Sequence, residues 1–515
     1  MYKYITDLRA DEVGKIYELR AKIEQIQQTS GPTLFTLFDG TGSIVAKTFA
    51  GPGVRAHPNL KEGFFIRAMV KLLIYDEALG AEMQSYATMS KQESDKLSLE
   101  IEHSLKKKAA PEKETLLVKS EILERLKPRM VAFATEVRRA IMESRPIILR
   151  HNADTDGYSA ALALEIAIIT QLAKHHDDEK AQWHYYKRYP SKSPSYEYTD
   201  ALKDLGTTLQ DMARFGMKEP LIILADFGGT RDEILGLKKI RAFGAKLIIV
   251  DHHYPGEQIC GKTELEQNSD VFVNPHCVGG DGNICTGMLA AEIAHLIDSK
   301  CYYPLLGAVA AIGDKVKGTE ADQFLAKANE LGYDTEFLHK LAECIDFDAH
   351  YLKFIESRGL VNEMLLSERE RQNALVDMLY DEIIKRRDAI LEVVKHYVET
   401  KEYNKFLFGL IDIGATTVRG EYPSAGKSTG ILFDYLKQNS NKPVIIFGCL
   451  SDAITIRSSS PEFNVNDFVH DLQKIFPHAL VEGGGHDVAG SVRFIEKAQP
   501  EIMAYAKEWM EQKGN

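Results

Sequence analysis

The residues best suited to chemistry form four groups of Asp and His side chains, each beside an apolar run. The first group is the string His-Asn-Ala-Asp-Thr-Asp-Gly at 151–157, which follows Ile-Ile-Leu. In a loop this spacing lets His151, Asp154 and Asp156 converge on one point, and two carboxylates with an imidazole suit Mn²⁺ or Mg²⁺. Gly157 permits a tight turn into the next helix. Taken alone, an Asp-x-Asp-Gly string also fits an ordinary turn or helix cap.

The other three groups follow apolar runs further along the chain. Asp226 closes Leu-Ile-Ile-Leu-Ala, Asp251-His252-His253 closes Lys-Leu-Ile-Ile-Val, and Asp314 follows Gly-Ala-Val-Ala-Ala-Ile-Gly. An uncompensated Asp-His-His triple directly after four apolar residues is costly in a core, and metal ligation would compensate it. Parallel α/β sheets place their ligands at the carboxyl ends of the strands, so we expect these groups to share one site.

The elements that must position these groups alternate between strands and helices from residue 146 to 340. Strand candidates recur at 147–149, 221–225, 247–250 and 271–273, and helical patterns such as 159–172 and 231–243 separate them. This alternation indicates a parallel sheet. Residues 341–402 are mostly helical and charged, which predicts a connector. Strand signals return in 403–515, which predicts a second, smaller α/β domain.

The first part of the chain has a different pattern. Residues 1–88 contain short strand candidates, such as Thr33–Phe38, with a turn signal at 39–42 and another at Leu79-Gly80. Several short strands joined by glycine turns predict a small barrel. Residues 89–145 are polar with helical periodicity, so we expect a helical linker in which Pro111 separates two helices.

Composition narrows the class of protein. The chain has 515 residues with 44% hydrophobic residues and a formal net charge of −12, so nucleic-acid contacts must come from local basic patches. No apolar run reaches the roughly 18–20 residues that cross a bilayer, and the N-terminus lacks a secretory signal. The six cysteines are scattered without a CxxC pair, which indicates reduced thiols. We therefore expect a cytoplasmic protein without a membrane partner.

Together the four groups resemble the DHH phosphoesterase family, in the order H-x-x-D-x-D-G, D, DHH and GD. A second match lies in the C-terminal part: GGGHDVAG at 483–490 resembles the signature of the DHH-associated domain, and Ile456-Arg457-Ser458-Ser459 resembles its arginine-bearing strand. Val488 stands where many relatives have alanine. The resemblance covers roughly 146–340 and 403–515. The strings LFDGTGSIVAKTF and EGFFIRAMVKL also resemble OB-fold nucleic-acid binders, so the whole chain is most similar to RecJ-like exonucleases, notably those of the archaeal type. Many related proteins carry a zinc-finger module, and we expect none here.

The resemblance implies a multidomain α/β protein with two divalent cations, which are Mn²⁺ with Mg²⁺ as the alternative. One ion would be held by His151, Asp154 and Asp226. The other would be held by Asp156, Asp226, His252 and Asp314, with Asp226 bridging. Asp251 and His253 would orient these ligands or contact phosphate. The implied catalytic set is Asp154, Asp156, Asp226, His252, His253 and Asp314, which would activate water for attack on phosphorus.

The resemblance also implies substrate contacts. Arg457 would clamp a phosphate oxygen, with Ser458 and Ser459 beside it. His486 and the backbone of Gly483, Gly484 and Gly485 would form a nest for phosphate. In the OB-like domain, the candidate stacking and phosphate contacts are Phe49, Arg55, His57, Phe65, Arg67 and Lys71. That domain could instead be a structural barrel or a protein-docking module.

Two further segments leave alternatives open. Residues 282–294 form a glycine-rich turn into a helix whose N-terminus could hold a phosphate, or Thr286 could simply cap that helix. Lys187, Arg188 and Lys192 could line a channel for a nucleic-acid strand or could lie in a solvated loop.

The function these features favour is an Mn²⁺-dependent exonuclease for single-stranded DNA, with RNA as a further possible substrate, that releases nucleoside 5′-monophosphates. The residues do not determine polarity; we favour 3′ to 5′. One alternative is a phosphodiesterase for short oligonucleotides or cyclic dinucleotides, although such enzymes usually need no OB module. Another is an inactive replication scaffold, which the complete carboxylate set opposes. A helicase or a replication or repair protein is an expected partner by family analogy only.

Overall fold

The computed structural model describes residues 2–75, 78–191, 193, 195–215, 217–227, 231–258, 261–352 and 359–514. These residues form two compact units, Met1–Ala110 and Pro111–Asn515, and each unit is described by itself. Lys192, one of the candidate channel residues, lies outside the described residues. Short 3₁₀ helices occur at Ile5–Asp7, Ala10–Glu12, Glu179–Ala181, Pro275–Val278, Pro477–Ala479 and Glu496–Ala498.

The first unit is the expected closed barrel. Its strands are β1 (Ile16–Gln28), β2 (Thr33–Phe38), β3 (Ser43–Thr48), β4 (Phe65–Tyr75) and β5 (Ala78–Thr88). They close in the order β1-β2-β3-β5-β4, with β4 pairing antiparallel to β1. The turn predicted at Leu79-Gly80 is wrong: both residues lie in β5, opposite Ile74 and Leu73. Glycine favours a turn, but the pairing of both residues with β4 places them in the strand.

Helix α1 (Lys91–Ala109) belongs to the barrel unit. Ser90 and Glu93 form a reciprocal capping box at its start, and Leu97, Ile101 and Leu105 are buried at helical spacing. The helix packs on the turn at 39–42, where a Cβ added to Gly40 would lie 2.9 Å from the Cα of Ile101. Residues 89–145 therefore contain one helix of the barrel unit and one, α2 (Glu121–Met142), of the second unit.

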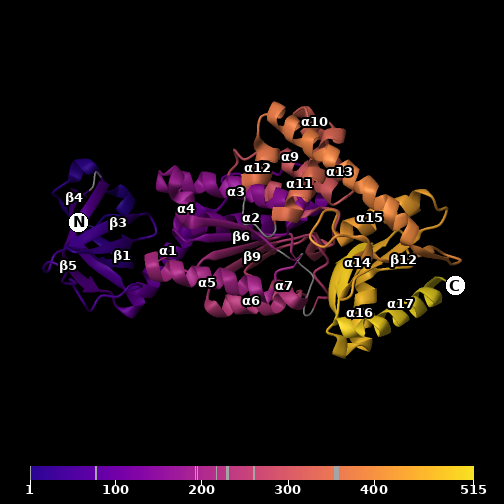
Figure 1. The fold of residues 1–515 in the computed structure, drawn as a ribbon. Coiled ribbons are helices and arrows are strands. Elements are labelled where there is room, and N and C mark those ends of the chain that lie inside the picture. Colours follow the sequence, from indigo (N-terminus) through magenta and orange to yellow (C-terminus); the bar gives the residue numbers. More distant parts are fainter. Residues whose placement is uncertain are drawn as a thin grey trace. The chain divides into compact units, whose positions relative to one another are not determined.

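The second unit begins with the expected parallel sheet (Figure 1). Its strands are β6 (Ile147–His151), β7 (Tyr186–Pro190), β8 (Leu221–Ala225), β9 (Lys246–Val250) and β10 (Val271–Val273), in the order β10-β9-β8-β6-β7. The surrounding helices are α3 (Thr155–His176), α4 (Gln182–Tyr185), α5 (Tyr198–Phe215), α6 (Arg231–Phe243), α7 (Glu264–Gln267), α8 (Thr286–Ile297), α9 (Pro304–Gly313), α10 (Thr319–Glu330) and α11 (Thr335–Leu352). We call residues 121–352 the parallel-sheet domain.

Alternate residues of the buried strands enter two separate cores, one on each face of the sheet. Ile223 and Val250 pack with α2, α3 and α8, whereas Ile222 and Ile249 pack with α5 and α6. Figure 1 shows α2 and α3 on one side of the sheet and α5 and α6 on the other. From β6 the chain passes to β7 on one side, and from β7 it returns past β6 to β8 on the other side. The strand order therefore reverses between β6 and β8, and such a switch point is where these sheets bind ligands.

The connector and the second α/β domain follow. The connector helices are α12 (Gly359–Leu366) and α13 (Arg369–Tyr397). Residues 399–514, called here the C-terminal domain, contain β11 (Glu399–Glu402), β12 (Leu407–Asp412), α14 (Ile413–Thr416), α15 (Ala425–Gln438), β13 (Val444–Cys449), β14 (Ala453–Ser458), α16 (Val465–Ile475), β15 (Glu482–His486), β16 (Ala489–Arg493) and α17 (Gln499–Gly514).

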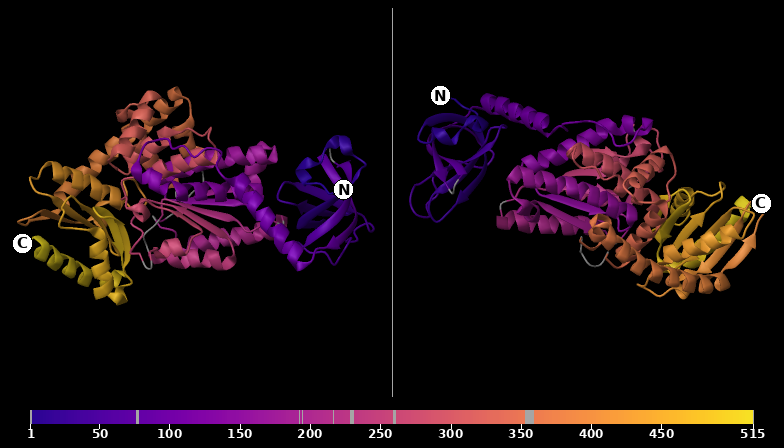
Figure 2. Two further views of the ribbon diagram at one scale, coloured as in Figure 1. Left: turned by 180° about the vertical axis from the view of Figure 1, so that it is seen from behind. Right: turned by 90° about the horizontal axis from the view of Figure 1, so that it is seen from above.

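The six strands of the C-terminal domain form one mixed sheet in the order β11-β12-β13-β14-β16-β15. Helices α16 and α17 pack on one face through Phe468 and Trp509, and α13 and α15 pack on the other through Val394 and Leu432 (Figure 2). Within the described part of the chain, every helix falls short of the length and apolarity needed to span a membrane.

Candidate metal centre

The candidate site lies at the carboxyl ends of β6, β8 and β9. His151 is the last residue of β6, and Asp226 and Asp251 directly follow β8 and β9. Asp226 has a φ of 61°, in the left-handed region that non-glycine residues rarely adopt, although Asp tolerates it better than most. The sheet therefore brings these side chains to one edge, and Asp226 occupies a strained backbone position there.

The loop after β6 presents the first group. The Nδ1 atom of His151 lies 2.7 Å from the carbonyl oxygen of Asn152, which fixes the ring, and its buried Nε2 has no hydrogen-bond partner. Asp154 caps α3, because its Oδ1 accepts from the amide of Gly157 at 2.9 Å. Gly157 is required, since an added Cβ would lie 2.3 Å from the carbonyl oxygen of Asn152. The cap and the candidate ligand are therefore the same carboxylate.

Asp156 is held by the N-terminus of α8. Its Oδ2 accepts from the amide of Thr286 at 2.9 Å and its Oδ1 from the amide of Gly287 at 2.7 Å. Segment 282–294 therefore starts a helix, as predicted, but a carboxylate of the protein occupies the position suggested for a phosphate. Thr286 is the first helical residue and not the cap, which is Cys285. Its hydroxyl instead lies 3.3 Å from Oδ1 of Asp226.

His252 lies at the centre of the acidic cluster. Its Nε2 atom lies 3.0 Å from Asp314 Oδ2, 3.6 Å from Asp226 Oδ1 and 3.7 Å from Asp156 Oδ2. Its Nδ1 atom lies 2.9 Å from the carbonyl oxygen of Gly282, which fixes the ring. Asp156, Asp226 and His252 are all buried and each offers an atom within 4.8 Å of the others.

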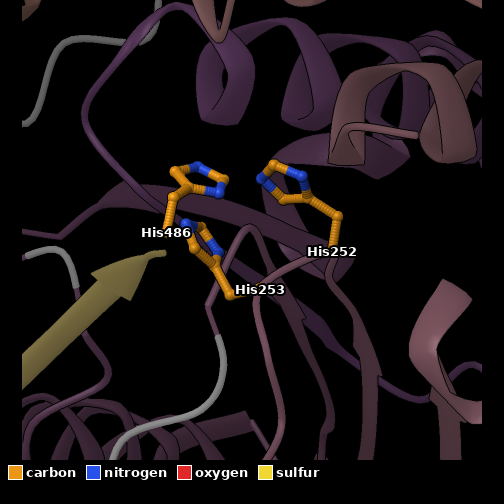
Figure 3. Close-up of side chains that lie close together, drawn as sticks. All are labelled: His252, His253 and His486. Carbon is orange, nitrogen blue, oxygen red and sulfur yellow. The ribbon is translucent and has the colours of Figure 1, made fainter. Parts of the chain in front are cut away.

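His253 and His486 complete the group. Nδ1 of His253 lies 2.9 Å from Oδ1 of Asp251 and 3.7 Å from Oδ1 of Asp226. Figure 3 shows that the rings of His252, His253 and His486 face one another, although His486 comes from β15 in the C-terminal domain. These three side chains also offer nitrogen atoms within 4.8 Å of one another. The C-terminal domain therefore contributes an imidazole to the site.

The charges of the cluster repel one another. Burial raises the pKa of Asp154 to about 7, and it also raises the pKa values of Asp156 and Asp226, with neighbouring carboxylates adding to each shift. Burial lowers the pKa of His252, but Asp314 together with Asp156 and Asp251 raises it by more, to about 10. Burial lowers the pKa of His486 to about 4. Several buried carboxylates with one cationic imidazole call for additional positive charge.

Five buried atoms of the cluster have no hydrogen-bond partner among the described residues, which is consistent with a need for that charge. They are His151 Nε2, Asp226 Oδ2, Asp251 Oδ2, His252 Nε2 and Asp314 Oδ2. Buried polar atoms are seldom left in this state unless an ion or water satisfies them. Carboxylate oxygen with imidazole nitrogen is a donor set that Mn²⁺ accepts well, so the residues present fit a divalent cation.

The residues expected to bind substrate lie in different surroundings. His486 joins the cluster, whereas Ser458 and Ser459 use their hydroxyls within the sheet, accepting from the amides of Ser460 and Val444. Arg457, on β14, donates to the carbonyl oxygen of Ile456 at 2.8 Å, and burial lowers its pKa. Among the described residues, no contact joins Arg457 to the acidic cluster.

Gly483, Gly484 and Gly485 lie in strand β15, where their φ values are 152°, 152° and 140°. The resemblance predicts that glycine is needed here so that a phosphate can approach the backbone. The structure gives a different reason for two of them. A Cβ on Gly483 would lie 2.3 Å from the carbonyl oxygen of Ser491, and a Cβ on Gly485 would lie 2.6 Å from that of Ala489. Close pairing with β16 therefore requires glycine at these positions.

The basic segment near 187 does not form a channel among the described residues. Lys187 and Arg188 lie in β7, beside β6, and not in the polar loop that the sequence pattern suggests. Lys187 Nζ lies 2.5 Å from Asp211, and the buried guanidinium of Arg188 lies 3.6 Å from Glu165. Both charges are therefore compensated within the fold.

In the barrel unit, the candidate contacts divide into two sets. Phe65, Arg67 and Lys71 alternate along the outer face of β4, where Arg67 pairs with Arg20 and Lys71 with Ile16 of β1. Arg67 also forms an ion pair with Glu93. Phe49 and Arg55 lie between β3 and β4; Phe49 is 64% exposed, and Arg55 donates to the carbonyl oxygen of Leu60. His57 packs against the rings of Phe35 and Tyr86.

Two positioning residues were not expected from the sequence. Asn274 is fully buried after β10, donates to the carbonyl oxygen of His253 at 2.9 Å and accepts from the amide of His276. A polar residue directly after a buried strand is the same signal that identified Asp226, so this residue could have been found. Asp346 lies within α11 and accepts from Thr155; no local pattern marks it.

Comparisons with known proteins agree with this architecture. Residues 146–312 match the DHH family, N-terminal domain. An uncharacterized protein of Methanocaldococcus jannaschii is 36% identical over an alignment of 515 positions. The alignment covers 95% of this chain and 68% of that protein. A solved structure described as the DHH domain of a member of the S1p family of ribosomal proteins is 39% identical. It covers 82% of this chain and 99% of its own, with a TM-score of 0.77.

The chain belongs to the DHH family. RecJ of Thermus thermophilus, solved in complex with Mn²⁺, is 16% identical, covers 80% of this chain and 59% of its own, and has a TM-score of 0.51. That likeness shows a shared fold over four-fifths of the chain. Family and fold together support an enzyme of the phosphoesterase or nuclease class.

Proposed function

We propose that the protein is an Mn²⁺-dependent exonuclease that hydrolyses single-stranded nucleic acid from the 3′ end and releases nucleoside 5′-monophosphates. The observation that carries the proposal is the buried cluster of Asp156, Asp226 and His252, whose ligand atoms lie within 4.8 Å of one another at a sheet switch point. Such a cluster is unfavourable without bound cations, and the family is one of phosphoesterases.

The donor set divides into two candidate positions that share Asp226. His151 and Asp154 would complete one, with Nε2 of His151 available to it. Asp156, His252 and Asp314 would complete the other. His253, oriented by Asp251, lies beside the shared carboxylate and is suited to accept a proton or to contact phosphate.

Two bound divalent ions would lower the pKa of a water molecule and neutralise charge that develops at phosphorus. The chain's own residues hold the candidate metal ligands in place. The N-terminus of α8 favours the ionised form of Asp156, and the carbonyl oxygen of Gly282 fixes the ring of His252. His486 closes the site from the C-terminal domain, next to His252 and His253. Arg457 would bind a more distant phosphate of the substrate.

The choice of a polymeric substrate rests on the barrel unit. Its closed five-stranded order is that of OB folds, which commonly bind single strands, and the outer face of β4 carries Phe65, Arg67 and Lys71. The name of one solved relative mentions an S1p family of ribosomal proteins, which supports testing RNA beside DNA.

The test is digestion of end-labelled single-stranded DNA and RNA with Mn²⁺, alongside a dinucleotide and a cyclic dinucleotide. Asp226→Asn is the matched inactive variant, because Asn keeps the shape and readily adopts the positive φ of this position. Asp322→Asn, at an exposed position of α10, is the control. We expect stepwise shortening of 5′-labelled strands by the wild type and the control, and none by Asp226→Asn. Cleavage of the small substrates alone would replace this proposal with that of a small-substrate phosphodiesterase.

A further inference from the structure

An ion cluster joins the C-terminal domain to the parallel-sheet domain close to the metal centre. Lys427, in the first turn of α15, places its Nζ 2.9 Å from Oδ2 of Asp346 and 3.2 Å from Oε2 of Glu343, both on α11. Burial lowers the pKa of Lys427, but Asp346 and Glu343 raise it by more, so the ammonium is charged. Two carboxylates of one domain therefore hold a cation of the other.

The second oxygen of Asp346 reaches the metal loop. Its Oδ1 accepts from the amide of Thr155 at 3.0 Å and lies 2.6 Å from the hydroxyl of the same residue. Thr155 stands between Asp154 and Asp156 and is the first residue of α3. The first amides of a helix lack partners within the helix, so Asp346 satisfies a group that the fold would otherwise leave open.

Thr155 also contacts the segment that carries Asp314. It is 1% exposed, and a Cβ added to Gly313 would lie 2.7 Å from the Cβ of Thr155. Gly313 directly precedes Asp314 at the end of α9. A shift of Thr155 would therefore move two acid-bearing segments of the candidate metal centre together.

The string Gly-Lys-Ser-Thr at 426–429 resembles the end of a phosphate-binding loop, but the structure gives these residues other roles. The ammonium of Lys427 is paired with carboxylates. Thr429 is buried, and its hydroxyl lies 2.6 Å from that of Thr455. The ammonium of Lys427 and the hydroxyl of Thr429 are therefore already engaged within the protein, so the lysine needs another explanation.

We propose that Lys427 is a positioning residue of the metal centre, which acts through Asp346 and Thr155. In this arrangement, seating of the C-terminal domain on α11 sets the loop that presents Asp154 and Asp156. The proposal rests on the proposed metal-dependent function, because it concerns the geometry of the same ligands. It adds a link by which one domain controls the metal affinity of the other.

The experiment measures Mn²⁺ binding by the full-length protein, from the loss of the free-Mn²⁺ signal in electron paramagnetic resonance. We expect Lys427→Met to weaken the affinity by roughly tenfold, as for other residues that support metal ligands. Lys437→Met, on the same helix, is the control and should change the affinity by less than about twofold. Lys427→Arg, which keeps the charge, should restore most of the affinity.

A double-mutant cycle separates this link from a general loss of structure. Thr155→Val keeps the packing against Gly313 but removes the hydroxyl, and it should weaken Mn²⁺ binding on its own. If both residues act through Asp346, the double variant should bind Mn²⁺ about as weakly as the weaker single variant. Additive losses would overturn the proposal, as would unchanged affinity in Lys427→Met or absence of Mn²⁺ binding by the wild type. Coupled Mn²⁺ affinities without nucleic-acid cleavage would instead overturn only the proposed nuclease function.

Discussion

The carboxylate of Asp156 rests on the first two amides of α8, with Oδ1 2.7 Å from the nitrogen of Gly287. A helix N-terminus carries partial positive charge and favours an anion there. In this protein the anion is a side chain of the metal loop and not a ligand phosphate. The helix therefore stabilises the ionised form of a group whose burial disfavours ionisation.

Gly287→Ala should disrupt this contact. An added Cβ would lie 2.3 Å from the Cβ of Ala310 on α9 and 3.0 Å from Oδ1 of Asp156. Because both neighbours are buried, we expect a loss of about 1–3 kcal/mol in the free energy of unfolding. Mn²⁺ affinity should fall by at least about tenfold. Urea unfolding and Mn²⁺ titration measure the two effects.

Gly206→Ala is the matched control for that substitution. Gly206 also lies in a helix, but a Cβ there would meet no atom within 4 Å. Alanine has the higher helix propensity, so the control should be neutral or more stable by up to about 1 kcal/mol. Wild-type stability and metal binding in Gly287→Ala would contradict the importance of the α8 contact.

His486→Ala tests what the C-terminal domain contributes. Its ring lies 5.2 Å from that of His252 and 4.9 Å from that of His253, whereas the carboxylates come from the parallel-sheet domain. We expect kcat to fall by roughly a hundredfold with little change in Mn²⁺ affinity. His478→Ala, an exposed histidine of the same domain paired with Glu501, should retain activity. A comparable loss of Mn²⁺ affinity in His486→Ala would make this residue a metal ligand.

The parts of the site that follow local rules could be predicted from the sequence, and the rest depend on distant contacts. Strands β8 and β9 are short apolar runs, each followed directly by an Asp, so the sequence predicts both the sheet and its candidate ligands. Strand β7 carries Lys187 and Arg188, and their partners Asp211 and Glu165 are remote in sequence. The role of Asp346 could not be predicted either, because only the packing of α11 brings it to Thr155.

Glu292 gives the protein a pH-dependent stability that is separate from the metal centre. It is fully buried in α8 and accepts from the amides of Leu117 at 2.6 Å and Val118 at 3.0 Å. Burial raises its pKa to about 7 despite these hydrogen bonds. The unfolded chain then ionises this group at a lower pH than the folded protein, so stability should fall as the pH rises from about 4.5 to about 7.

Glu292→Gln should remove this dependence, which amounts to about 3 kcal/mol for a shift of this size. The measurement is the difference in free energy of unfolding between about pH 5 and about pH 8, in wild type and variant. Glu330→Gln, at an exposed position of α10, controls for other titrating groups. An equal pH dependence in Glu292→Gln and wild type would show that Glu292 ionises normally in the folded protein.

The outer face of β1 and β4 should bind the nucleic-acid strand. Lys22 of β1 pairs with Phe65 of β4, and Lys71 lies further along the same face of β4. Lys22→Glu combined with Lys71→Glu should weaken binding of a long single strand. The slope of the logarithm of the binding constant against the logarithm of the salt concentration should become shallower by about 1.4, which corresponds to two phosphate contacts. Lys91→Glu with Lys96→Glu, on α1 of the same unit, is the charge-matched control.

The same variants distinguish a binding barrel from a structural one. If the barrel holds the strand, the Lys22 and Lys71 variant should raise KM for long strands and leave cleavage of a dinucleotide unchanged, because a dinucleotide is too short to need a second site. Phe49→Ala, at a 64% exposed position, should add a loss of about 1–3 kcal/mol in binding if a base stacks there. Equal affinity for long strands in the variant, the control and the wild type would assign the barrel a structural or protein-docking role.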